Sequence, residues 1–212
     1  MRIIELKNED RRMVKTSGLV IAILLAGNFL SGCALLGAGP AALDTFSLSS
    51  PASTYSGGVR SGVQLLVTEP TALKAYDGER IVVQPRPTEI SYLSGAQWAD
   101  RLPPLVQAKL IETLQKADKF RGVGKSGEGL AIDYQVQTEI RAFDVAVDNG
   151  NTANVEIYAR LLNDRNGQVA ASRSFTARAS MQAGGNDAYA NAIDRAFAQV
   201  AVELTQWVID SL

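Results

Sequence analysis

The chain has 212 residues, enough for one ample domain or two small ones, and an ordinary composition of 46% hydrophobic and 20% charged residues with a formal net charge of -1. No polybasic stretch occurs after the first fifteen residues, which removes the electrostatic signature of nucleic-acid binding, and one cysteine cannot form an internal disulfide. The chain has no histidine, which excludes Ser-His-Asp and Cys-His catalysis and imidazole zinc sites, and this favours a protein that binds over an enzyme.

Residues 1–32 have the pattern of a secretory signal peptide, in which a positive leader precedes a short apolar core. The core is residues 19–26, and the basic residues before it are Arg2, Lys7, Arg11, Arg12 and Lys15. A membrane-spanning helix is the alternative, because residues 16–43 carry no charge, but the strongly apolar part is far shorter than the roughly 20 residues that a bilayer needs. Met13 opens a compact signal sequence of its own, so translation starts at either Met1 or Met13.

The tetrapeptide Leu30-Ser31-Gly32-Cys33 resembles the lipobox of bacterial lipoproteins. The resemblance implies that a signal peptidase recognises the first three residues and cuts before Cys33. It also implies a diacylglycerol on the thiol and an N-acyl chain such as palmitate, with no other cofactor. A buried structural thiol is the alternative for a lone cysteine. The residue after the cysteine is Ala34, and not the Asp that would keep a lipoprotein from transfer to the outer membrane. The resemblance to enteric lipoproteins therefore implies an outer-membrane anchor that faces the periplasm.

Residues 33–43 are rich in Gly and Ala and are expected to form a lipidated tether, followed by a single domain over residues 44–212. Its first half contains four predicted strands separated by turn signals: residues 45–48, 63–67, 80–84 and 89–93. A helix is then predicted from about Leu102 to Lys119, with Pro103 and Pro104 in its first turn, where missing amide donors matter least.

The second half begins with a long alternating segment, residues 130–147, whose apolar phase changes near Arg141 and predicts a bulge. Turns lead into residues 155–161 and 169–179, which completes a three-strand antiparallel meander. The apolar spacing after Gly184-Gly185-Asn186 predicts a terminal helix with a break and a cap at its start. The order of elements predicts an α+β fold: a two-layer domain of mostly antiparallel sheet with two amphipathic helices on one face.

The search for chemistry identifies few candidates, and no metal site among them. The Gly-rich residues 122–129 fail the Walker A spacing and follow a helix, so we expect a flexible connection there. Glu139 and Asp144 are expected on a solvated sheet surface. Tyr92 and Trp98, the aromatics of an irregular connection, are expected in the core, and a partner-facing position is the alternative that makes them candidates for partner contact.

Residues 88–120, TEISYLSGAQWADRLPPLVQAKLIETLQKADKF, resemble the ABC-type transport auxiliary lipoproteins, a PqiC-like family. The shared pattern is a strand ending in Tyr92, a short gap, Trp98, and an amphipathic helix with spaced leucines. The order of elements agrees over residues 44–210, and the lipobox agrees as well. The Pro103-Pro104 pair and the Gly-rich loop depart from the family pattern.

The resemblance implies a non-enzymatic, lipid-anchored accessory subunit of an intermembrane phospholipid transport system. Its partners would be an MCE-domain protein and its ABC transporter, which the lipoprotein docks at the outer membrane; a homo-oligomeric ring is one arrangement that the resemblance allows. The alternative is an outer-membrane lipoprotein that serves another envelope assembly or a peptidoglycan-associated complex. A lipid esterase without histidine is a third and weaker alternative.

Overall fold

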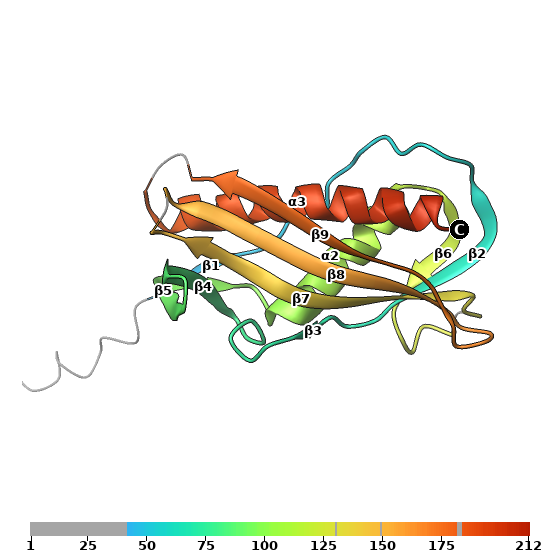
Figure 1. Cartoon of the computed structure of the whole chain (residues 1–212), viewed down its shortest axis with the longest axis horizontal. Coiled ribbons are helices and arrows are strands. Elements are labelled where there is room, and N and C mark those ends of the chain that lie inside the picture. The colour runs from blue at the N-terminus through green and yellow to red at the C-terminus, as the bar shows by residue number, and fades with distance from the viewer. Residues whose placement is uncertain (1–41, 130, 149, 182–183) are drawn as a thin grey trace, which may run out of the picture. The chain divides into compact units, whose positions relative to one another are not determined.

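The computed structural model describes residues 42–129, 131–148, 150–181 and 184–212 (Figure 1). Their secondary structure lies in one compact unit, Leu43–Leu212. Its elements are β1 (Asp44–Phe46), β2 (Arg60–Val67), β3 (Thr71–Ala72), β4 (Arg80–Arg86), β5 (Glu89–Trp98), α2 (Leu102–Lys116), β6 (Phe120–Gly124), β7 (Tyr134–Ala146), β8 (Thr152–Asn163), β9 (Val169–Ser180) and α3 (Asn186–Asp210). The predicted signal peptide, the lipobox and Cys33 lie outside the described residues, so their roles stay predictions.

All strands belong to one mixed sheet organised around β7. One edge of β7 pairs with β8 over its whole length, and β8 pairs with β9, both in antiparallel register. The other edge of β7 pairs in parallel with short stretches of β2, β3 and β4 in turn. Because the long pairs are antiparallel and the parallel pairs are short, the prediction of an α+β fold with a mostly antiparallel sheet is confirmed.

The two helices cover one face of this sheet, as predicted (Figure 1). Alternate residues of β8 point toward them and are fully buried: Ala153, Val155, Ile157, Ala159 and Leu161. Two aromatic contacts join sheet to helix α3, Phe143 with Phe197 at 6.0 Å between ring centroids and Phe175 with Trp207 at 5.5 Å. Each large apolar side chain that is buried in this layer stabilises the fold by about 1.5–3 kcal/mol.

The predicted bulge in β7 is present, since the register with β8 shifts between Ile140 and Ala142. Because of this shift, Ile140 and Phe143 both face the helices although they are three residues apart. Asp144 therefore points to the opposite face of the sheet, which we call the open face. The prediction of a solvated surface holds for Glu139, which is exposed, but is wrong for Asp144, which is 1% exposed. Asp144 is covered because the turn over residues 73–79 brings Tyr76 against it.

Three further differences from the sequence-based expectation have identifiable structural causes. Helix α2 ends at Lys116, before Lys119, because Asp118 takes a left-handed conformation with φ of 51°. Strand β6 takes in part of the Gly-rich stretch, because it pairs in parallel with β2. The break before α3 is confirmed, but Asn186 does not cap the helix; its Nδ2 donates to Asp44 Oδ2 at 3.0 Å, and Gly185 occupies the cap position.

Candidate functional site

A bulge in β5 separates the two aromatic candidates. Tyr92 pairs with Val82, and Gln97 pairs with Arg80. Between these two pairs β5 advances by five residues while β4 advances by two, so β5 contains extra, unpaired residues. Gly95 lies within this bulge with φ of 73°, a conformation that favours glycine. Tyr92 and Trp98, six residues apart, would share a face in a regular strand. The bulge instead directs Trp98 toward the helices and Tyr92 toward the open face.

Trp98 is therefore a core residue, as expected, and the alternative that made it a candidate for partner contact is wrong. Its side chain is 1% exposed, and its ring meets Phe143 edge-on with the ring centroids 6.0 Å apart. A side chain so deeply buried offers no surface to a partner.

Tyr92 is partly buried on the open face and keeps its place as a candidate. The guanidinium carbon of Arg80 lies 3.5 Å from the centroid of its ring, a cation–π arrangement worth about 0.5–1 kcal/mol at an exposed site. Arg80 forms no ion pair with any other residue of the described ranges. The Arg80 guanidinium is therefore positioned by the Tyr92 ring, and no carboxylate of the described residues neutralises its charge.

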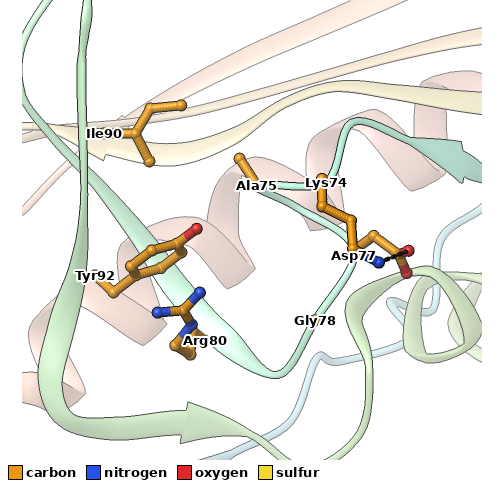
Figure 2. Close-up of a pocket in the computed structure, with 7 residues that line it drawn as sticks. All are labelled: Lys74, Ala75, Asp77, Gly78, Arg80, Ile90 and Tyr92. Carbon is orange, nitrogen blue, oxygen red and sulfur yellow. Dashed lines mark hydrogen bonds and ion pairs between the residues drawn. The ribbon is translucent and has the colours of Figure 1, made fainter.

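Arg80 and Tyr92 line a hollow of about 440 Å³ (Figure 2). The other lining residues are Lys74, Ala75, Asp77, Gly78 and Ile90. Ile90 is 49% exposed and supplies an apolar wall, while Lys74 and Asp77 form an ion pair of 3.4 Å away from Arg80. The hollow therefore combines apolar surface, an aromatic ring and one uncompensated cation.

The turn over residues 73–79 forms one side of the hollow and is held by the start of α2. The Arg101 Nε donates to Asp77 Oδ1 at 3.2 Å, and Arg101 also reaches Glu69 at 3.3 Å. The Arg101 guanidinium lowers the pKa of the Asp77 carboxyl below its usual value through these hydrogen bonds. The backbone N–H of Leu102 donates to the carbonyl of Gly78 at 3.0 Å. These contacts fix the turn relative to the helix.

A buried polar cluster holds the same turn to the centre of the sheet. Tyr76, 5% exposed, donates its hydroxyl to Asp144 Oδ2 at 2.6 Å. The side-chain amides of Gln84 and Asn154 donate to the same carboxyl group at 3.2 and 3.4 Å. Burial raises the pKa of the Tyr76 hydroxyl, and the hydrogen bond to Asp144 raises it further, so the hydroxyl stays a donor. The hydrogen bond from Tyr76 to Asp144 thus ties the turn beside the hollow to strand β7.

Tyr76→Phe is expected to lower the free energy of unfolding by about 1.5–3 kcal/mol, because it removes a hydrogen bond to a buried carboxylate. Tyr158→Phe is the matched control, since its hydroxyl makes no hydrogen bond to another described residue, and it should cost less than about 0.5 kcal/mol. Urea unfolding followed by circular dichroism measures both. Equal costs for the two variants would show that the Tyr76–Asp144 contact does not hold the turn.

The part of the open face around Arg141 is charged but internally compensated. Arg141 lies over the ring of Tyr158 at 4.3 Å and reaches Glu139 at 3.4 Å and Glu156 at 3.8 Å. Among the residues that the structure describes, no three acidic or sulfur side chains gather in a way that could hold a metal ion. No described helix is long and apolar enough to cross a membrane. The chemistry that this face offers at Arg80 and Tyr92 is recognition of an anionic group next to apolar surface.

The hollow could not be found from the sequence alone, because it joins the turn over residues 73–79 to two strands. Tyr92 was singled out, but Arg80 was missed, since an arginine within a strand carries no signal of its own. The pairing of Arg80 with Gln97 and the bulge that follows bring its guanidinium under Tyr92. Within the turn over residues 73–79, Asp77-Gly78 is a residue pair typical of turns, and it is the part of the site that the local sequence indicates.

Comparison with known proteins identifies the family. Residues 45–205 match the ABC-type transport auxiliary lipoprotein component family. The chain is 28% identical over 200 residues to an uncharacterized protein of Bradyrhizobium diazoefficiens, a match that covers 93% of this chain and 52% of the relative. The chain therefore spans about half the length of the curated relative that it matches.

Solved structures agree with this assignment. The crystal structure of a protein from Xanthomonas campestris superimposes with a TM-score of 0.67 at 26% identity, covering 80% of this chain and 93% of that one. A crystal structure of an uncharacterized protein has a TM-score of 0.63 at 15% identity over 78% of this chain and 98% of that one, which shows a shared fold. The family match over most of the folded domain confirms the resemblance seen in residues 88–120, and the chain belongs to the ABC-type transport auxiliary lipoprotein family.

Proposed function

We propose that this protein is a lipid-anchored, non-catalytic accessory subunit of an MCE/ABC-type intermembrane lipid transport system, and that it docks the transport assembly at the outer membrane. The family match over residues 45–205 carries the proposal, because that family is described as an auxiliary lipoprotein component of ABC-type transport. The lipobox pattern at residues 30–33 supports the anchor, and the hollow beside Tyr92 supports a binding role.

The anchor limits how far the domain can lie from the membrane. Ten residue steps separate Cys33 from Leu43, and a fully extended chain covers at most about 3.6 Å per residue, so the tether reaches about 35 Å. A diacylglycerol and an N-acyl chain on Cys33 together give stable attachment, because each buried methylene contributes about 0.8 kcal/mol. The domain would work in the periplasm, close to the outer membrane.

The partner-binding surface would be the docking corner, which we define as Arg80, Ile90 and Tyr92. Arginine and tyrosine are enriched among the residues that contribute most to protein–protein binding. An acidic side chain of the partner would pair with Arg80, whose guanidinium lies against the Tyr92 ring. Apolar partner surface would cover Ile90 and the exposed edge of Tyr92.

A photoreactive amino acid at Ile90 tests this surface in living cells. The 49% exposed side chain lines the hollow, so a docked partner should be crosslinked on irradiation and appear as a discrete heavier band. The matched control is the same photoreactive residue at Val59, which is 64% exposed, precedes β2 and does not line the hollow. Crosslinking at Ile90 should exceed that at Val59 several-fold. Equal yields at the two positions would place the partner elsewhere.

A further inference from the structure

The last strand of the sheet leaves a long backbone edge open. Strand β9 has twelve residues, eleven of which pair with β8, and no other described strand pairs with it. Most of its side chains are exposed, and only Phe175 and Ala177 are buried, against the helix layer. Figure 1 shows β9 at the margin of the sheet. The backbone carbonyl of Ser180, at the end of β9, accepts a hydrogen bond from the Arg195 side chain at 2.8 Å.

The strands at the other two ends of the sheet are short, so β9 is the longest strand at a margin of the sheet. Strand β1 has three residues and β6 has five, and short edge strands are a common protection against unwanted pairing. Strand β9 contains no proline, and its pairing with β8 runs without interruption from Ala171 to Ser180. A regular edge of this length is a template on which another extended segment can add.

The charges that this edge strand carries have one sign. Strand β9 carries Arg173 and Arg178 and no acidic residue. Arg160 of β8 lies opposite Ser172, which adds a third arginine beside the strand. The acid in β8 nearest to the middle of β9 is Glu156, and Arg141 already reaches it at 3.8 Å. The edge is therefore positive in a chain whose net charge is -1.

We propose that β9 accepts an extended, acidic segment of a partner protein as an added strand of the sheet. Backbone hydrogen bonds to β9 would supply affinity, and acidic side chains in the segment would pair with Arg173 and Arg178. A second copy of this chain fits less well, because two β9 strands side by side would bring arginines together with no acid in either strand to pair with them. The added strand goes beyond the proposed docking corner, and it does not depend on which transport system the partner belongs to.

Photoreactive residues at Ser172 and Thr176, placed one at a time in the full-length protein in cells, test this proposal. Both side chains are exposed and lie on the same face of β9. If a strand adds there, the crosslinked positions in the partner, read by mass spectrometry, fall in one acidic segment and lie about four residues apart, since side chains repeat every two residues along a strand. Crosslinks to peptides of this same chain, to scattered positions, or to no protein would overturn the proposal.

Charge reversal supplies the matched comparison. Arg173→Glu combined with Arg178→Glu should lower the crosslinking yield at Thr176 by about tenfold, the effect of roughly 1.4 kcal/mol lost from two charge pairs. Arg121→Glu reverses an exposed arginine of β6 that has no ion pair with another described residue, and it should leave the yield unchanged. A thermal melt shows that both variants fold. Crosslinking at Ile90 is scored separately, so failure of the β9 proposal is distinct from failure of the docking corner.

Discussion

Trp98→Ala is expected to lower the free energy of unfolding by about 3–5 kcal/mol, the usual cost of emptying a site that a large aromatic side chain fills. The indole is 1% exposed and contacts Phe143, which in turn packs against Phe197 of helix α3. Its removal leaves a cavity where strand β5, strand β7 and the helix layer meet. Urea unfolding of the folded domain, followed by circular dichroism, measures the loss.

Tyr92→Ala is the comparison that separates the two faces of β5. Tyr92 is partly buried on the open face, where it packs against the margin of the core and lies against the Arg80 guanidinium in a cation–π arrangement. Its replacement should cost no more than about 1.5 kcal/mol. If both variants lost the same stability, the bulge at Gly95 would not divide the aromatic residues between core and surface.

Cys33→Ala is expected to abolish acyl labelling of the protein and to release the domain from the membrane fraction. The thiol is the atom that would carry the diacylglycerol, and alanine offers no nucleophile in its place. Metabolic labelling with an alkyne fatty acid and fractionation of the envelope measure both effects. The expected labelling is at background, and the unprocessed precursor should accumulate.

Ser31→Ala is the matched control for the lipobox, because it keeps a small side chain in the segment that a signal peptidase would read. It should be labelled and fractionated like the natural sequence. Unchanged outer-membrane fractionation of Cys33→Ala would refute the lipid anchor. Loss of labelling in Ser31→Ala alone would show that the peptidase does not read residues 30–33 as a lipobox.

The parts of the fold that local periodicity dictates could be predicted from the sequence. The alternation of residues 130–147 predicted strand β7 and its bulge, and the three- and four-residue spacing of apolar side chains predicted α2 and α3. Strands β3 and β6 were missed because they have two and five residues and depend on pairing with β7 and β2. Such short segments have too few residues to show a pattern of their own.

Long-range packing accounts for what the sequence could not predict at the candidate site. Asp144 was expected in solvent, because nothing near it in sequence indicates that Tyr76, 68 residues earlier, covers it. Tyr92 and Trp98 were treated alike, because the bulge that separates them appears only in the register of β5 with β4. The uncompensated charge of Arg80 is likewise a property of the assembled sheet.

The most direct test of the proposed function is the identity of the proteins that are crosslinked through the photoreactive residue at Ile90. After irradiation, the anchored protein is purified from solubilised envelopes under denaturing conditions, and its covalent partners are identified by mass spectrometry. We expect an MCE-domain protein or another component of an ABC transporter in the Ile90 sample and much less of the same protein in the Val59 sample. Recovery of peptidoglycan-associated proteins with no transporter component would contradict it.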